Sequence, residues 1–241
     1  LFRSGVYNPL QGDYPVVQLR NKSPFVPDQM VWCVFNDEGA GALHTASNGD
    51  DFPVEVQLTA WAFDDSLLNN TVFTSHKLIF RTTEDLDSCF IGIWADFDIG
   101  CYADDYIGTA PALNAMYAFN LDAVDGLVGN SCDDIPVFEN IPPVQSITFL
   151  NTSMDKAIIN SPNAPFSQNT AVSYYNLLNG HWSDGTPLTA GGSGYLSSNT
   201  PADLIFPDAP NDPNGWSMCT AKIAFGDRQG VASHRIGRIR P

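Results

Sequence analysis

The stretch WADFDIGCYADDYIG, residues 94–108, decides how the fold is interpreted. It places four aspartates between two apolar runs, CFIGIW (89–94) and ALNAMYAF (112–119). Carboxylates this close repel one another and do not ionise together in a buried site without compensation. Because a bound divalent cation removes that conflict, we expect a rigid, partly sheltered loop between two buried strands.

The ion we expect there is Ca²⁺, which takes about 6–8 oxygen ligands from carboxylates, carbonyls and water. Asp96 and Asp98 are one residue apart, so an extended backbone directs both carboxylates to the same side. The stretch is not an EF-hand, because its sixth position is Cys101 and not glycine. The alternative is an acidic loop in solvent whose aspartates cap turns. The predicted metal ligands are Asp96, Asp98, Asp104 and Asp105.

Short segments rich in β-branched and aromatic residues, separated by turn residues, continue on both sides of this loop. They predict an all-β fold, a β-sandwich of jelly-roll type with long loops. One or two further strands are expected in the tail after residue 219. The other predicted strands are 29–37, 54–63, 71–83, 89–97, 112–120 and 142–151, with a helical turn as the alternative for 112–120.

One segment has helical periodicity instead. Ala171, Tyr174, Tyr175 and Leu178 follow the spacing of a helix face, so we expect one short helix near 170–179. Gly180 is placed to end it, and Ser167, Asn169 or Thr170 to cap its start. We therefore divide the chain into a sandwich core with the acidic metal loop (1–151) and a second part (152–241). That second part holds the helix, a Gly-rich loop and the terminal strands, and is expected to pack on the same domain.

Composition excludes several classes of protein. The hydrophobic fraction is 44%, which is too high for a disordered chain. The net charge of −16 repels phosphate backbones, so nucleic-acid binding is not expected. Apolar runs are too short for a transmembrane helix. The chain starts without Met and has no signal peptide, which favours a piece of a longer polypeptide or assembly.

The five cysteines have no zinc-type spacing. In an extracellular setting, one or two disulfides with one thiol left over are expected, and the spacing leaves their pairing open. Cys33 lies in the apolar pattern MVWCVF, which predicts a buried thiol or a partner in a core disulfide.

Catalytic motifs are absent from the sequence. Ser193 lies between glycines in a loop, which is not the strand-to-helix turn of a nucleophile elbow. The histidines show no metalloprotease spacing, and we interpret all four as structural: His44, His76, His181 and His234. We therefore expect a protein that is not an enzyme. A hydrolase that uses two of the aspartates is kept as an alternative.

Aromatic residues around the Gly-rich loop suggest another alternative, a carbohydrate-binding module. Exposed rings can stack on sugars, and three residues are candidates for this role: Trp182, Tyr195 and Trp216. Tyr174 and Tyr175 fall on the apolar side of the expected helix and are assigned to the core.

Several phrases together resemble a recurring region of large proteins exported by the type IX secretion system of Bacteroidota. They include MVWCVFND, VEVQLTAWAF, FIGIWADFDIGCYADDYIG, YYNLLNGHWSDGTPLTAGGSGY and FGDRQGVASHRIGRIRP. The resemblance implies secretion, with an extracellular or outer cell-surface location. This chain departs from the pattern at two places. Related sequences tend to carry Cys-Asp where this chain has Thr109 and Ala110, and often a second Cys where it has Ala118. Asp65-Ser66-Leu67 is similar to the O-glycosylation site of such bacteria, which makes Ser66 a candidate, with an ordinary turn as the alternative.

These observations lead to one main hypothesis: a non-catalytic, Ca²⁺-stabilised structural or adhesive module of a secreted or surface-attached bacterial protein. Its expected partners are glycans or other surface proteins.

Overall fold

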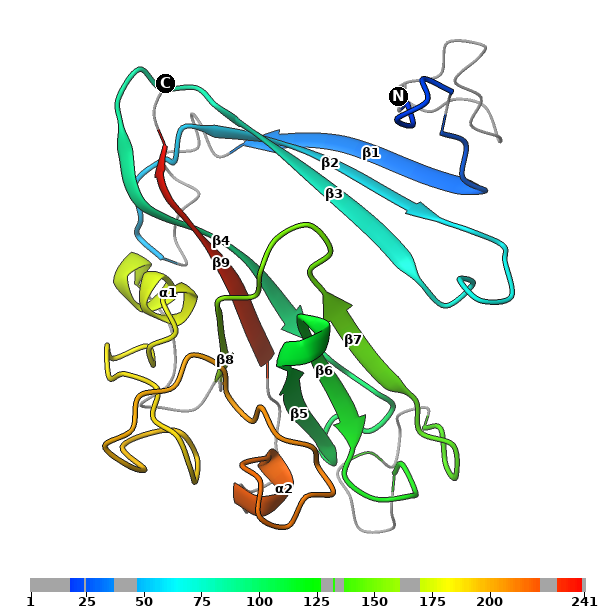
Figure 1. The fold of residues 1–241 in the computed structure, drawn as a ribbon, viewed down its shortest axis with the longest axis vertical. Helices are drawn as coiled ribbons and strands as arrows, with labels where there is room; N and C mark the ends of the chain where they lie inside the picture. Colours follow the sequence, from blue (N-terminus) through cyan, green and yellow to red (C-terminus); the bar gives the residue numbers. More distant parts are fainter. Residues whose placement is uncertain are drawn as a thin grey trace. The chain divides into compact units, whose positions relative to one another are not determined.

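The computed structural model describes residues 18–23, 25–36, 47–126, 132, 137–160, 170–221 and 229–239. The protein is mostly β, with three small antiparallel sheets of three strands each and short helices (Figure 1). The sheets do not close into a barrel within these residues. The chain divides into two compact units, and the boundary lies between Asp85 and Leu86. The second unit also includes the short segment Ser47–Gly49.

The first unit contains one sheet, in the order β1-β2-β3. Its strands are β1 (Gln29–Asn36), β2 (Val54–Ala62) and β3 (Val72–Phe80), which confirms three of the predicted strands. Trp61 of β2 stacks on its cross-strand neighbour Phe73, with 5.8 Å between ring centroids and 11° between planes. Aromatic pairs of this kind add to the stability of a sheet beyond the area they bury.

Two sequence predictions fall in this unit. Cys33 is an exposed free thiol on edge strand β1, so the prediction of a buried thiol or a core disulfide partner is wrong. Ser66 lies exposed in the turn between β2 and β3. That turn is held by Asp65, whose Oδ1 accepts the N–H of Leu67 at 2.9 Å. The ordinary-turn interpretation of Asp65-Ser66-Leu67 therefore has a physical basis in an Asx turn.

The second unit contains two sheets, and the first has the order β4-β9-β8. β4 (Leu86–Asp96) covers the predicted strand 89–97 except for its last residue, and β9 (Gln229–Ile239) is one long strand in the tail. β8 (Lys156–Asn160) was not predicted. Both strand pairs in this sheet are antiparallel. β9 lies between β4 and β8, which are both distant from it in sequence.

The other sheet of this unit has the order β5-β6-β7. β5 (Asp105–Ala110) begins inside the stretch 94–108 that was predicted to be a loop. The loop is therefore shorter than predicted, and Asp105 is the first residue of a strand. The first two residues of the predicted strand 112–120 belong instead to the 3₁₀ turn Pro111–Leu113. β6 (Ala115–Asn120) and β7 (Val144–Thr148) complete the sheet.

The predicted helix is confirmed as α1 (Ala171–Leu178). Thr170 caps it through a capping box with Ser173, which satisfies two backbone N–H groups at the helix start. Gly180 follows with φ +71°, the left-handed conformation that favours glycine after a helix. A second helical turn, α2 (Met218–Ala221), was not predicted. Among the described residues, no helix is long and apolar enough to cross a membrane.

One hydrophobic core serves both sheets of the second unit. It joins Met116 of β6, Ile158 of β8 and Val231 of β9, and Leu177 of α1 and Phe206 pack in it. Each of these side chains is at most 2% exposed. Residues before and after position 151 thus share one core.

Candidate functional site

The acidic stretch begins where β4 ends, and its side chains alternate between core and solvent. Phe97 and Ile99 are buried, with 4% and 2% of their surface exposed. Asp96 and Asp98 are exposed. The alternation agrees with the prediction that these two carboxylates share a side, and that side faces solvent.

A tight turn follows at Gly100. Its φ is +61°, and a Cβ at this position would overlap the carboxylate of Asp125. Cys101 is fully buried and forms a disulfide with Cys132, at a sequence separation of 31. The Asp104 N–H then donates to the carbonyl of Cys101 at 3.3 Å and closes the turn. The disulfide and the turn together restrain the loop at Cys101.

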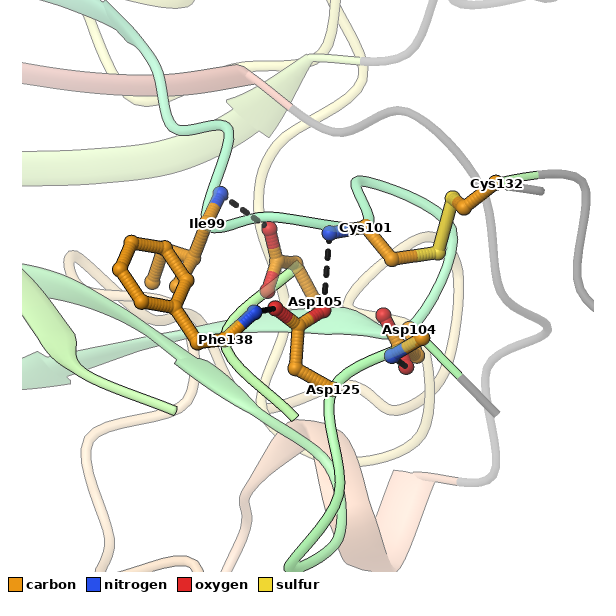
Figure 2. The surroundings of a disulfide bond; sticks show 8 residues. Ile99, Cys101, Asp104, Asp105, Asp125, Cys132 and Phe138 are labelled. Carbon is orange, nitrogen blue, oxygen red and sulfur yellow. Dashed lines mark hydrogen bonds between the residues drawn. A yellow bond between two sulfur atoms is a disulfide. The ribbon is translucent and has the colours of Figure 1, made fainter. Parts of the chain in front are cut away.

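Three aspartates gather below this turn, and we call Asp104, Asp105 and Asp125 the acidic cluster (Figure 2). All three are buried, with 5%, 5% and 1% of their surface exposed. Asp125 accepts two backbone N–H groups, from Cys101 at 2.8 Å and from Phe138 at 2.5 Å. The members of the cluster come from different elements: Asp105 is the first residue of β5, and Asp125 lies in the segment after β6.

The other two members also accept backbone N–H groups. Asp105 Oδ2 accepts the N–H of Ile99 at 2.8 Å, and Asp104 Oδ2 accepts that of Gly126 at 3.2 Å. These bonds explain part of why the chain concentrates aspartates here. Carboxylates satisfy backbone donors that the irregular loop leaves outside any strand ladder.

The cluster still carries an uncompensated electrostatic cost. The pKa of Asp105 is raised to about 7, mainly by burial and in addition by the neighbouring carboxylates of Asp104, Asp125 and Asp98, against the N–H of Ile99. Burial, together with Asp125, also raises the pKa of Asp104, against the N–H of Gly126. The charged groups that act on Asp105 are therefore all acidic, and its charged form is disfavoured.

The structure divides the four predicted metal ligands. Asp104 and Asp105 belong to the cluster, whereas Asp96 and Asp98 face solvent. In the part of the chain that the structure describes, no three His, Cys, Asp or Glu side chains are grouped as a metal site would need. The four aspartates therefore do not form a ready-made cage.

Sequence reasoning missed Asp125, the most buried member of the cluster. It lies 24 positions after Cys101, whose N–H it accepts. The only local mark is the dipeptide Asp125-Gly126, which is a turn signal and says nothing about burial.

The three candidate sugar-binding residues, Trp182, Tyr195 and Trp216, lie around the Gly-rich turn and differ in exposure. Trp182 is 3% exposed and its indole N–H donates to Gly194 O at 3.1 Å, so it belongs to the core and offers no open face. Tyr195 and Trp216 are partly exposed. Tyr195 donates its hydroxyl to Asp184 at 2.8 Å, and Trp216 donates its indole N–H to Gly192 O at 2.9 Å.

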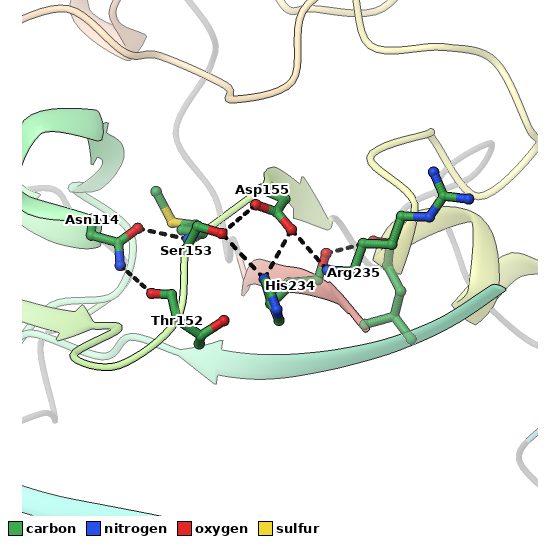
Figure 3. A network of polar contacts seen from close by, with 9 residues as sticks. Asn114, Thr152, Ser153, Asp155, His234 and Arg235 are labelled. Atoms are coloured by element: carbon green, nitrogen blue, oxygen red, sulfur yellow. Dashed lines mark hydrogen bonds and ion pairs between the residues drawn. The ribbon is translucent and has the colours of Figure 1, made fainter. Parts of the chain in front are cut away.

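A serine, an aspartate and a histidine also meet in the second unit (Figure 3). Ser153 Oγ lies 3.2 Å from His234 Nδ1 and donates to Asp155 Oδ1 at 2.6 Å. Asp155 Oδ2 lies 2.9 Å from the same His234 Nδ1. A Ser-His-Asp relay needs the serine and the aspartate on opposite ring nitrogens. Because both contact Nδ1, this group lacks the geometry of such a relay, and it links the segment before β8 to β9.

Comparison with protein-family models, with curated proteins and with solved structures gives no match for this chain.

Proposed function

We propose that this chain is a non-catalytic structural or adhesive module of a secreted or cell-surface bacterial protein, and that Ca²⁺ stabilises it. The observation that carries the calcium part is the acidic cluster. Its buried carboxylates repel one another, and Asp105 Oδ1 is buried and accepts no hydrogen bond from any described residue. A hard cation offers such oxygens a partner and removes the repulsion.

Two observations support an extracellular location. The disulfide Cys101–Cys132 lies beside the cluster, and disulfides persist mainly in oxidising compartments. The resemblance to proteins of the type IX secretion system points to the same location. The acidic surface, with a net charge of −16, suits a protein that works in the presence of extracellular Ca²⁺.

We further propose that the second unit is a β-sandwich in which its two sheets pack face to face. Gly230 of β9 supports this, because a Cβ there would overlap the Met116 sulfur of β6 and lie 3.1 Å from Phe97. Such close approach of two sheets requires glycine on one of them. A sandwich of this kind provides a rigid scaffold for the acidic cluster at its edge.

The calcium part is tested by thermal unfolding of the full chain in EGTA and in CaCl₂. At a Ca²⁺ concentration of about 100 times Kd we expect the melting temperature to rise by roughly 5–10 °C, because the ion binds only the native state. The Asp105→Asn variant should lose most of this rise. Asp155→Asn, which changes an aspartate outside the cluster, is the matched control and should keep it. Equal melting temperatures for the wild-type protein in both buffers would rule out calcium stabilisation.

A carbohydrate-binding role is the second candidate, favoured by the two partly exposed rings at one Gly-rich turn. Trp216 donates a hydrogen bond to Gly192 O and Tyr195 donates one to Asp184, so both rings are held in place. Rings that are held rigidly bind sugars at a low cost in conformational entropy. A glycan array gives the test: binding that is lost in Tyr195→Ala and Trp216→Ala would support this role, and an array without binding would exclude it.

A further inference from the structure

Two buried oxygen atoms at the start of β5 and the end of β6 lack a hydrogen-bond donor. They are Asp105 Oδ1 and Asn120 Oδ1, and neither accepts a hydrogen bond from any residue in the described ranges. Both side chains are more than nine-tenths buried, with exposures of 5% and 7%. A buried acceptor without a partner costs about 1–3 kcal/mol, so two of them together call for an explanation.

The register of the sheet brings these two side chains together. Asp105 and Asn120 are directly opposite one another in the antiparallel pair of β5 and β6. Opposite residues of an antiparallel pair have their side chains on the same face, with Cβ atoms about 4.5–5.5 Å apart. The two acceptor oxygens therefore belong to one small region of the sheet surface.

The remaining polar atoms of both residues are already used, which fixes their orientation. Asp105 Oδ2 accepts the N–H of Ile99 at 2.8 Å. The Asn120 amide nitrogen donates to the carbonyl of Asp122 at 3.2 Å. Asn120 must then present its oxygen, and an amide oxygen cannot donate to a carboxylate. Two acceptors placed together need a shared proton, a donor or a cation between them.

The surrounding charge selects a cation. Asp98 and Asp104 both act electrostatically on Asp105, and both are acidic. Carboxylate and amide oxygens are hard ligands, the type that Ca²⁺ prefers. Asp98 is exposed, which leaves the side of the site toward solvent open for water ligands.

We propose that Asp105 Oδ1 and Asn120 Oδ1 are the inner protein ligands of a hard divalent cation, and that Asp96 is not a ligand. This inference rests on the proposed calcium stabilisation and replaces the four aspartates of the loop with a cross-strand pair. Asp98 completes the site from the solvent side. Two carboxylates, one amide and water explain why no group of three acidic or histidine side chains marks the site.

The test is isothermal titration of CaCl₂ into the EGTA-treated full chain. Asn120→Ala should bind Ca²⁺ roughly tenfold more weakly or worse, because it removes an inner ligand. Asn120→Asp should bind it roughly tenfold more tightly, because it adds a charge at the same position. Asn120→Asp should also melt below the wild-type protein in EGTA and regain its melting temperature in CaCl₂.

Two controls separate ligation from folding. Asn160→Ala removes another buried asparagine, 1% exposed and at the end of β8, and should keep wild-type Ca²⁺ affinity. Asp96→Asn should keep it too. If the wild-type protein binds Ca²⁺ while Asn120→Ala and Asn120→Asp both bind like Asn160→Ala, the ligand assignment is overturned and the proposed calcium stabilisation remains. If the wild-type protein shows no heat of binding, both are overturned.

Discussion

The acidic cluster and the Asp155–His234 pair use the same residue type in opposite ways. Asp125 and Asp155 each accept backbone N–H groups, so both tie a loop to its neighbours. Asp155 is about one-third exposed and has His234 as a basic partner within the chain. The cluster is buried, and the charges acting on Asp105 are acidic.

The pKa shifts express this difference. Burial alone would raise the pKa of Asp155. Hydrogen bonds from Ser153 and the N–H of Arg235, with His234 nearby, outweigh burial and hold this pKa below its usual value. Burial raises the pKa of Asp105 to about 7. An aspartate with a partner in the chain stabilises the fold by itself, whereas a buried group of aspartates needs a proton or a cation from outside. Each prediction below tests this contrast.

The largest effect is expected from removing the disulfide beside the cluster. The double variant Cys101→Ala, Cys132→Ala should lose about 3–4 kcal/mol of unfolding free energy, because a crosslink over 31 residues restricts the unfolded chain. Urea unfolding under oxidising conditions measures it. Cys33→Ala, at an exposed free thiol, is the control and should change stability by less than about 0.5 kcal/mol. A double variant as stable as this control would mean that the cluster does not depend on covalent support.

A smaller effect is expected from Gly100→Ala, which acts on the cluster through the backbone. The new methyl group would overlap the carboxylate of Asp125, and φ at this position is +61°. We expect a loss of about 3 kcal/mol, from backbone strain and from the displaced hydrogen bond to the Cys101 N–H.

Gly191→Ala is its matched control, because φ there is +93° and nothing lies within 4 Å of a built Cβ. It should lose only about 1–2 kcal/mol, the cost of the backbone conformation alone. Urea unfolding of both variants isolates the contact with Asp125. Equal losses would show that the Asp125 carboxylate moves aside without cost.

The effects of pH should have opposite signs in the two regions. In EGTA, ionising Asp105 should destabilise the protein as pH rises from about 4 to about 7. The reason is that the unfolded chain releases this proton near pH 4 and the folded chain near pH 7. Asp105→Asn should flatten that part of the curve of unfolding free energy against pH.

Asp155 should act in the other direction. Its lowered pKa contributes stability that is present above about pH 4 and is lost as pH falls through the lower folded value. Asp155→Asn should therefore lose about 0.5–1 kcal/mol at pH 7, and this difference should disappear at low pH. Urea unfolding between about pH 2 and pH 8 tests both variants, and curves that the substitutions leave parallel to the wild-type curve would contradict the contrast.

Sequence patterns predicted the elements whose signal is local. The alternation in 54–62 and the helical spacing in 171–178 identify β2 and α1, and Gly180 marks the end of the helix. β8, with only five residues, and β5, which begins with an aspartate, carry no such signal. Both are strands because of their partners: β8 pairs with β9, far away in the chain, and β5 with β6.

The site was predictable only in part, for the same reason. The acidic stretch identified Asp104 and Asp105, but their burial and the exposure of Asp96 and Asp98 depend on packing. Asp125 and Asn120 join the site through the turn after β6 and the register of β5 with β6. No pattern within the acidic stretch contains that register, so the proposed ligand set cannot be obtained from the stretch alone.

The position of β9 has a consequence for how the protein reaches its folded state. Residues 229–239 form the middle strand between β4 and β8, so those two strands have no sheet with each other until the last strand arrives. While the ribosome still holds this segment, β4 and β8 keep unpaired backbone edges that favour aggregation. The sheet of β4, β9 and β8 is therefore completed only when residues 229–239 are free to pair with both partners.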